Sequence, residues 1–359
     1  MSLLVYGANG YSGELIAAHL AERGLRAILA GRRAEAVAPV ARRLGFDSRT
    51  FDLGHPEQID RGLAGVTVVL NCAGPFSRTA GPMVDGCLRA RAHYLDITGE
   101  IMVFAAVAAR DAEARAAGVM LLPGAGFDVV PSDCLAAHVG RRLPGATRLR
   151  LAFRAGGGLS RGTALTSFES AAGGGLVRRG GALTNVPLGH QTISVDFGRG
   201  PRPAISIPWG DVFTAHVTTG IPDVEVYLAA PVRARLALRA ARLFRPLLAS
   251  GPVRRLIRSR LDARPGGPDE NIRKTRDMLL WGEAGDAQGR AVVSRMRTPN
   301  GYELTRLTAV DLAARALAGE VQPGYQTPAR VYGADYVLGF PGVSREDVSE
   351  TNSIVSNMV

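Results

Sequence analysis

Three glycines at a spacing of three residues follow the first apolar segment, and they constrain the fold more than any other feature. Residues 3–6 predict a strand, and the residues after Gly13 have the apolar spacing of a helix. In this setting Gly7 permits a tight turn, Gly10 lets the backbone approach a pyrophosphate, and Gly13 lets the helix pack closely on the strand. The helix N-terminus then faces the phosphates. We therefore predict a dinucleotide site, with a glycine-rich turn that binds nothing as the alternative. The predicted cofactor contacts here are Gly7, Asn9, Gly10, Tyr11, Ser12 and Gly13.

Strand-like and helical segments alternate through the first third of the chain. The further predicted strands are residues 27–30, 49–51, 66–70, 93–97 and 119–122. Such alternation favours a parallel sheet covered by helices. We therefore predict an α/β fold in which a Rossmann, doubly wound parallel sheet spans residues 1–135. Its ligand is expected beyond the carboxyl ends of the strands.

The residues after the second predicted strand indicate which nicotinamide cofactor binds. NAD enzymes usually place Asp or Glu here for the ribose 2′-hydroxyl, whereas arginine accommodates a 2′-phosphate. This chain has Arg32 and Arg33, and guanidinium groups suit phosphate through paired planar donors. We therefore predict NADPH as the cofactor, bound by Arg32 and Arg33, although a purely solvated role stays open for Arg33. Asp52, after the third strand, is a predicted neighbour of the adenine.

Loops after the later strands supply candidates for the nicotinamide half of the site. The loop predicted to pass beside the nicotinamide ribose consists of Cys72, Ala73, Gly74, Pro75 and Phe76. The catalytic candidates are Asp128, Tyr94 and Asp96, and the substrate candidates in this domain are Phe76, Glu100 and Phe127. Burial at a strand end raises a carboxyl pKa, which would make Asp128 a usable acid. Helix capping is the alternative for Asp128 and the preferred interpretation of Asp133. Hydrogen bonding within the domain is the alternative for Tyr94 and Asp96.

Composition excludes several other functions. The net charge of +11 is almost entirely arginine, because Lys274 is the only lysine, and no nucleic-acid-binding motif accompanies it. Residue 270 is Glu, so the Tyr-x-x-x-Lys pair of short-chain reductases is absent. Cys72, Cys87 and Cys134 lie far apart, which argues against a disulfide framework and a structural zinc, and we expect no metal. No apolar run reaches the ~20 residues of a membrane span, so we expect a cytoplasmic protein without an integral membrane segment.

Several motifs together resemble the saccharopine dehydrogenase-like oxidoreductase family. They are GANGYSG, AGR, NCAGPF, YLDITGE and GFDVVPSD in the first domain, then Gly301-Tyr302, GYQTPA and GADY towards the C-terminus. Residues 160–163 resemble a stretch of the trans-acting enoyl reductase-like branch, which makes Thr163 a predicted substrate contact. True saccharopine reductases would carry a tyrosine-bearing loop after the fourth strand. Phe76 in this loop cannot donate a proton, which puts amino-acid chemistry in doubt.

The resemblance also implies how the rest of the chain is organised. A second, α+β mixed-sheet domain is expected at residues 136–303, where it covers the nicotinamide and mediates formation of a homodimer. Residues 304–359 are expected to return to the Rossmann domain, beginning with an amphipathic helix at 304–317. The segment 232–261 is rich in arginine and apolar residues. It is interpreted as ordinary surface helices or as a basic surface for an acyl-carrier protein or anionic lipid.

Three functions follow as hypotheses. The first is an NADPH-dependent oxidoreductase that reduces a C=C or C=N bond of a small apolar, lipid or natural-product substrate. The second is an amino-acid C–N dehydrogenase of the saccharopine or carboxynorspermidine type. The third is a non-catalytic scaffold protein that keeps NADP as a structural ligand. The sequence identifies neither the substrate nor the bond that is reduced, since a fold hosts many chemistries.

Overall fold

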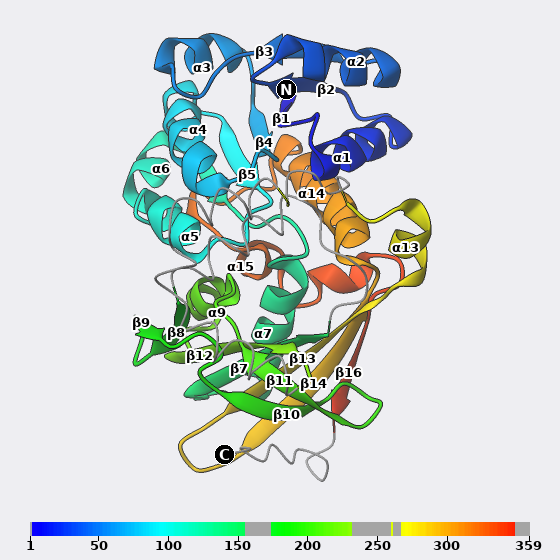
Figure 1. The fold of residues 1–359 in the computed structure, drawn as a ribbon. Coiled ribbons are helices and arrows are strands. Elements are labelled where there is room, and N and C mark those ends of the chain that lie inside the picture. The colour runs from blue at the N-terminus through cyan, green and yellow to red at the C-terminus, as the bar shows by residue number, and fades with distance from the viewer. Residues whose placement is uncertain (1, 155–173, 232–259, 261–266, 349–359) are drawn as a thin grey trace. The chain divides into compact units, whose positions relative to one another are not determined.

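A computed structural model describes residues 2–154, 174–231, 260 and 267–348 (Figure 1). Thr163 lies outside the described residues, as does the segment 232–261 except for Arg260. The chain divides into two compact units, which are described separately. Unit 1 comprises Met1–Val130 and Gly301–Tyr332, and unit 2 comprises Pro131–Asn300 and Gly333–Val359.

Unit 1 is built on a sheet of seven parallel strands in the order β15-β6-β5-β4-β1-β2-β3. Its strands are β1 (Leu3–Tyr6), β2 (Ala27–Gly31), β3 (Asp47–Thr50), β4 (Val68–Asn71), β5 (His93–Asp96), β6 (Met120–Leu122) and β15 (Gly324–Tyr325). The chain winds outward from β1 to β3 on one side and from β4 to β6 on the other. This order confirms the predicted Rossmann, doubly wound α/β fold and places the topological switch point between β1 and β4.

Helices connect these strands in unit 1. They are α1 (Tyr11–Glu22), α2 (Ala34–Leu44), α3 (Pro56–Gly62), α4 (Phe76–Ala90), α5 (Ile101–Ala108), α6 (Asp111–Ala117), α14 (Gly301–Leu317) and α15 (Pro328–Tyr332). The helix α7 (Val130–Arg142) begins at the boundary between the units. Helices α5 and α6 follow each other with only two residues between them. They are separated at Arg110, whose guanidinium pairs with Glu113 at 2.6 Å.

The sequence of each strand follows its position in the sheet. The central strands β1 and β4 are buried along their whole length and read LLVY and VVLN. Nearly continuous apolar sequence is typical of parallel strands that are covered on both faces. The edge strand β3 reads DSRT and is mostly exposed. Burial in the middle of the sheet therefore explains why the central strands do not alternate between apolar and polar residues.

The helices α3 and α4 pack so closely that one position between them excludes a side chain. A Cβ on Gly86 of α4 would lie 2.3 Å from Cγ2 of Ile59 and 3.2 Å from a methyl carbon of Leu63. Ile59 lies in α3 and Leu63 directly follows it, and each of these side chains is only 1% exposed. Gly86 is thus required by packing rather than by backbone conformation.

Unit 2 contains a mixed sheet of nine strands, which confirms the predicted second α+β domain. Seven strands run in the order β10-β11-β12-β7-β13-β14-β16, and β8 pairs with β12 and β9. The strands are β7 (Arg148–Arg154), β8 (Gly175–Arg179), β9 (Ala182–Val186), β10 (Thr192–Asp196), β11 (Pro201–Ser206), β12 (Asp223–Ala229), β13 (Met278–Gly285), β14 (Ala291–Thr298) and β16 (Ser344–Val348). The shorter elements are α9 (Asp211–Thr219), α13 (Glu270–Thr275) and the 3₁₀ helix η1 (Tyr336–Gly339). Only β12 and β7 pair in parallel in this sheet, within the described residues.

The two faces of the unit 2 sheet carry different apolar contacts. On one face, Leu135 of α7 packs against Gly282 of β13, where a Cβ would lie 3.0 Å from its Cγ. On the other, Trp281 belongs to a buried apolar cluster with residues of β7, β10 and β12. Arg295 of β14 forms an ion pair with Asp196 at the end of β10, at 2.8 Å, and so connects these two strands. The sheet therefore has an apolar core against α7 and a second one beneath β10.

The C-terminal segment divides between the units, which corrects the expectation that residues 304–359 return to the Rossmann domain as a whole. Helix α14 and strand β15 belong to unit 1, where β15 pairs with β6. Beyond Tyr332 the chain belongs to unit 2, and β16 pairs antiparallel with β14. The sequence of β16 is SREDV, with charged residues that suit an exposed edge strand.

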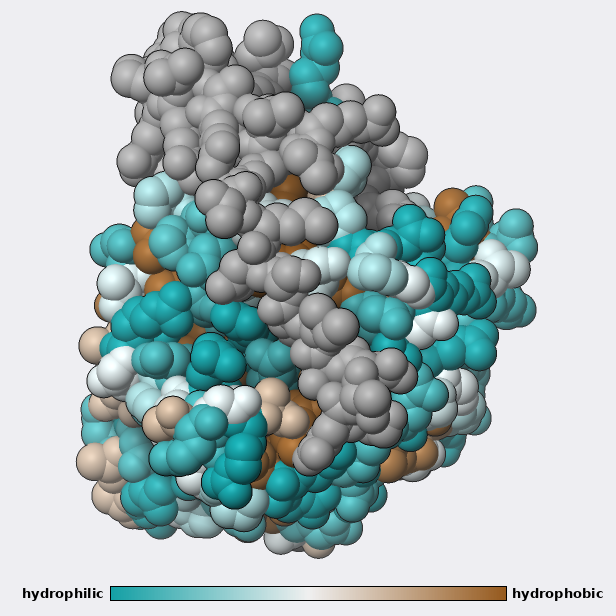
Figure 2. Space-filling view, turned by 90° about the horizontal axis from the view of Figure 1, so that it is seen from below, coloured by the Kyte–Doolittle hydropathy of each residue, from teal (hydrophilic) through white to brown (hydrophobic). Residues whose placement is uncertain are grey.

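The described surface is mostly polar. In the view of Figure 2, hydrophilic side chains dominate among the described residues, and apolar ones form small separate areas. Met102, in the first turn of α5, is the exposed large hydrophobic residue among the described ones, with 67% of it exposed. None of the described helices is both long enough and apolar enough to cross a bilayer.

We expect Gly86→Ala to destabilise the protein by about 1–3 kcal/mol, because the added methyl group must displace the buried side chains of Ile59 and Leu63. Chemical unfolding followed by circular dichroism measures this loss. Gly339→Ala is the control, since a Cβ there meets nothing within 4 Å. Its expected change is within about 0.5 kcal/mol. Equal stability of the two variants would contradict the proposed tight contact between α3 and α4.

Candidate dinucleotide-binding site

The turn between β1 and α1 is closed by contacts that only glycine permits. Gly7 has φ +82°, and a Cβ there would lie 2.7 Å from the backbone nitrogen of Ala73. A Cβ on Gly13 would lie 2.3 Å from the carbonyl oxygen of Gly7. The amide of Gly10 donates to that same carbonyl at 3.0 Å. The turn therefore brings the N-terminus of α1 to the carboxyl ends of β1 and β4, as a pyrophosphate cradle requires.

A polar cluster lies where β1, β2 and β3 end. The hydroxyl of Tyr6 donates to the carbonyl of Phe51 at 3.0 Å. Burial, together with the nearby Asp52, raises the pKa of Tyr6 to about 12, and the Arg32 guanidinium opposes this rise. Tyr6 thus lies near both of the residues predicted for the adenosine half of the cofactor. Arg32 is exposed, and so is Arg33, whose guanidinium lies 3.9 Å from the carboxylate of Glu35.

Asp52 has a local structural contact. One carboxylate oxygen accepts a hydrogen bond from the amide of Gly54 at 2.7 Å, and the Asp52 amide donates to Gln58 at 3.1 Å. The side chain therefore shapes the turn after β3 and remains partly exposed at the sheet edge. This position is compatible with its predicted place beside the adenine.

The loop after β4 is held in one conformation by side chains. Asn71 accepts from the amide of Ala73 at 3.1 Å, and the hydroxyl of Thr79 donates to the carbonyl of Ala73 at 2.6 Å. The Gly74–Pro75 peptide bond is cis. The structure thus brings this loop against the glycine turn through the contact between Gly7 and Ala73.

Glu100 caps the helix that follows this loop. Its two carboxylate oxygens accept hydrogen bonds from the amides of Phe76 and Ser77, at 2.8 and 3.0 Å. A negative charge at a helix N-terminus is favourable, because the first amides lack partners within the helix. Glu100 thereby fixes the start of α4 and the position of Phe76. The sequence predicted Glu100 as a candidate for the substrate site and did not predict this cap, because a strand separates Glu100 from the start of α4.

Tyr94 and Asp96 hydrogen-bond within the domain, and neither is exposed to solvent. Asp96 accepts from the Tyr94 hydroxyl at 2.7 Å, from the Thr98 amide at 3.0 Å and from the Gly124 amide at 2.9 Å. Burial raises the pKa of the Asp96 carboxyl to about 6, while these three hydrogen bonds oppose the rise. The pair therefore ties the end of β5 to the loop after β6, as the alternative interpretation from sequence stated.

Asp128 is partly exposed, as Glu100 is, whereas Asp96 is fully buried. The Asp128 side chain lies against the backbone of Gly99, where a Cβ would be 3.0 Å from Oδ2. Burial raises the pKa of Asp128 to about 6. Its carboxyl is thus at the carboxyl ends of β5 and β6, the edge where the nicotinamide half of a dinucleotide lies in this fold. Asp133, by contrast, is buried in unit 2 and accepts a hydrogen bond from the hydroxyl of Thr218.

Phe127 and Cys72 are less suited to chemistry. Phe127 is buried, with 6% exposed, and its ring packs on Gly301, where a Cβ would lie 3.1 Å from Cγ. Burial, with Asp96 nearby, raises the pKa of the Cys72 thiol well above its usual range, so the thiol is neutral. The described residues hold no group of His, Cys, Asp and Glu suited to a metal ion.

Helix α14 contributes residues that sequence reasoning did not select. Tyr302 packs edge-on against Tyr11 of the glycine turn, with ring centroids 5.1 Å apart and an angle of 87°. Thr305 accepts a hydrogen bond from the amide of Phe127 at 3.0 Å. The Gly301-Tyr302 motif and the amphipathic pattern of residues 304–317 predicted this helix, but nothing local marks Thr305.

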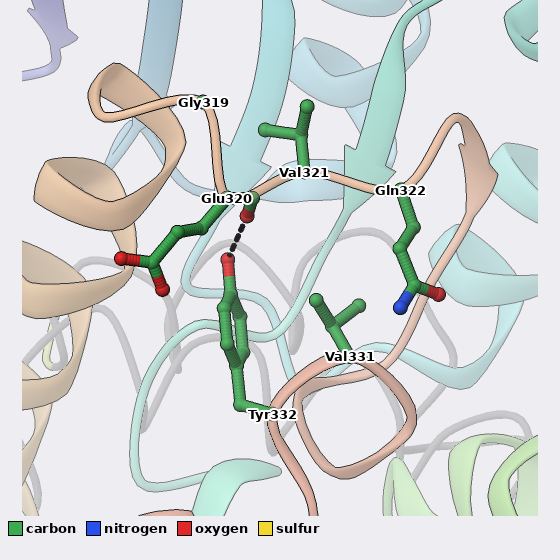
Figure 3. A pocket seen from close by; sticks show the side chains of 6 residues that line it. All are labelled: Gly319, Glu320, Val321, Gln322, Val331 and Tyr332. Atoms are coloured by element: carbon green, nitrogen blue, oxygen red, sulfur yellow. Dashed lines mark hydrogen bonds between the residues drawn. The ribbon is translucent and has the colours of Figure 1, made fainter.

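A small pocket in unit 1 is formed by the turn after α14 and by α15 (Figure 3). Gly319, Glu320, Val321, Gln322, Val331 and Tyr332 line it. The Tyr332 hydroxyl points across the pocket and donates to the Glu320 carbonyl at 2.8 Å. None of the residues predicted for the cofactor or substrate lines this pocket, so it is not the candidate site.

Known proteins are similar to the first domain in sequence and to nearly the whole chain in fold. A family model described as "Saccharopine dehydrogenase NADP binding domain" matches residues 3–122. The trans-acting enoyl reductase of Mycobacterium leprae (strain TN) is 34% identical over 149 residues, which are 39% of this chain and 36% of that protein. The Mycobacterium ulcerans protein of the same name is 32% identical over 148 residues, 39% of this chain and 35% of that protein. The match thus spans about a third of the length of these relatives.

Two solved structures resemble the chain along nearly its whole length. The apo saccharopine dehydrogenase (L-Glu forming) of Saccharomyces cerevisiae has a TM-score of 0.64 at 11% identity, and covers 97% of this chain and 100% of its own. The homospermidine synthase of Legionella pneumophila, in complex with NAD, has the same TM-score and identity and covers 98% and 93%. At this identity the likeness shows the fold alone. Residues 3–122 thus match the saccharopine dehydrogenase NADP-binding domain, in a chain whose fold resembles that of saccharopine dehydrogenase.

Proposed function

We propose that this protein is an NADPH-dependent oxidoreductase that reduces a C=C or C=N bond of a small, apolar substrate. The observation that carries the proposal is the glycine turn, whose close contacts at Gly7 and Gly13 exclude side chains and hold the N-terminus of α1 against the end of β1. The match of residues 3–122 to an NADP-binding domain supports the same cofactor class. The name of the mycobacterial relatives, trans-acting enoyl reductase, favours a C=C bond.

The residues present fit NADPH in both halves of the site. The N-terminus of α1 would face the pyrophosphate, and Arg32 would pair with the 2′-phosphate beyond β2. The loop of residues 72–76 would line the nicotinamide ribose. When bound, NADPH supplies a hydride, and the protein contributes orientation, a proton and exclusion of water.

Asp128 is the proposed proton donor. Reduction of a conjugated C=C or a C=N bond adds a hydride to one atom and a proton to the other, so a protein acid has to stand near the cofactor. Asp128 is partly exposed, lies beyond the strands β5 and β6, and has a raised pKa of about 6, which allows it to hold a proton in weakly acidic solution. Tyr94 and Asp96 are fully buried and serve to position the loops.

We expect Arg32→Ala to weaken NADPH binding roughly 10- to 100-fold, because charge-assisted hydrogen bonds to the 2′-phosphate are lost. Binding of NADH, which lacks this phosphate, should not change. Fluorescence titration of both cofactors with wild-type and variant protein measures the effect. Arg33→Ala is the matched comparison, and a smaller loss is expected because Glu35 lies close to that guanidinium. Equal binding of NADPH and NADH by the wild type would refute the NADP preference.

We expect Asp128→Asn to lower kcat ~100- to 10,000-fold without changing the NADPH dissociation constant, because only the acid is removed. The assay follows NADPH oxidation with the N-acetylcysteamine thioester of crotonic acid as a neutral α,β-unsaturated probe. In the wild type, kcat should fall as pH rises above about 6, since the protonated fraction of Asp128 falls.

The carboxyl of Asp96 also has a pKa of about 6 and is therefore the control for this pH dependence. Asp96→Asn should retain the decrease of kcat above pH 6, whatever its effect on the maximal rate, whereas Asp128→Asn should lose it. If the decrease disappears only in Asp96→Asn, Asp128 is not the proton donor.

A further inference from the structure

One face of α14 contacts both of the loops that the proposed function requires. Tyr302 packs on Tyr11, the first residue of α1, directly after the glycine turn. One turn further along the same helix, Thr305 accepts the hydrogen bond from the Phe127 amide. Residues three apart lie on the same side of a helix, so both contacts come from one face.

The contact with the second loop is made by several groups. Besides the hydrogen bond from Phe127, a Cβ on Gly126 would lie 2.9 Å from Cγ2 of Thr305. The hydroxyl of Thr308 donates to the carbonyl of Ala125 at 2.8 Å. Residues 125–127 are therefore fixed from one side, and Asp128 follows them directly in the chain.

The helix is a suitable support because it is itself anchored. Its residues Leu304, Thr308, Ala309 and Val310 are fully buried, and it packs against α1 and β4 of unit 1. Arg306, on the neighbouring side, forms ion pairs with Glu303 and with Glu22 of α1, the latter at 3.3 Å. A shift of α14 would therefore move both loops together.

We propose that Thr305 is a positioning residue for Asp128 and that Tyr302 is a positioning residue for the phosphate-binding turn, so that one helix sets the distance between cofactor and proton donor. This inference rests on the proposed function, in which Asp128 supplies the proton. Neither residue touches the reacting atoms in this scheme. Each acts through the loop that it contacts.

Thr305→Val tests the first contact, because valine keeps the shape of threonine but cannot accept a hydrogen bond. We expect the Phe127 amide to exchange its hydrogen roughly tenfold faster, since a buried donor loses its partner. We also expect kcat for the crotonyl thioester to fall about tenfold or more, with the NADPH dissociation constant unchanged. Thr305→Ser retains the hydroxyl and should restore both values.

Tyr302→Ala tests the second contact. It should change NADPH binding and leave the exchange of the Phe127 amide unchanged, which is the reverse of the result expected for Thr305→Val. We expect the NADPH dissociation constant to rise several-fold, because the loss of an aromatic contact loosens the turn at Tyr11. Exchange of the Phe127 amide should stay as in the wild type. Tyr302→Phe keeps the ring and should bind NADPH normally.

The outcomes separate this inference from the proposed function. If the wild type turns over the thioester but Thr305→Val leaves both kcat and Phe127 exchange unchanged, the positioning role is wrong and the function stands. If Tyr302→Ala and Thr305→Val each change binding and kcat equally, the helix only stabilises the fold and the inference fails. If the wild type neither binds NADPH nor reduces the thioester, the proposed function fails together with the positioning role, while Phe127 exchange still reports the structural contact.

Discussion

The close approach of backbone segments at the carboxyl end of β1 is the constraint on which the site in unit 1 depends. Gly7 lies against the backbone of Ala73, and Gly13 lies against the carbonyl of Gly7. These contacts tie the turn, the helix α1 and the loop after β4 to one another without any side chain between them. The proposed site is therefore shaped by contacts within the chain itself, and preorganisation of this kind lowers the cost of binding a ligand.

Carboxylates that accept backbone amides organise the other half of the site. Asp96 joins the ends of β5 and β6 through the amides of Thr98 and Gly124, and Glu100 fixes the first turn of α4. These side chains are acidic and lie beyond strand ends, which is why the sequence presented them as candidates for chemistry. Their engagement with the backbone gives them a structural role. Glu100 and Asp128 are both partly exposed, but both carboxylate oxygens of Glu100 accept amides of α4, so Asp128 is the carboxyl that we propose meets a substrate.

The parts of the fold that could be predicted are those that depend on the sequence of a few neighbouring residues. Strand-like runs, helix periodicity and the glycine turn each depend on local sequence, and they were sufficient for strands β1 to β6 of the Rossmann sheet, whereas the second domain was expected from the resemblance to a family. Contacts between distant residues carry no such signal. Thr305 and Phe127 are 178 positions apart, and Thr305 has the sequence surroundings of any helical residue. The pairing of β16 with β14 escaped prediction for the same reason, since a short polar strand acquires its place only from its partner.

The path of the chain has a consequence for producing the cofactor domain by itself. A fragment that stops at Val130 contains six strands of the parallel sheet but lacks β15 and α14, which come from Gly301–Tyr332. It would expose the apolar surface that α14 covers and leave the loop at Phe127 without its support. Since Phe127 packs on Gly301, the two stretches of unit 1 already meet at that point. A short linker from residue 130 to residue 301, in a chain that ends at Tyr332, would therefore give a continuous unit 1 without either stretch of unit 2.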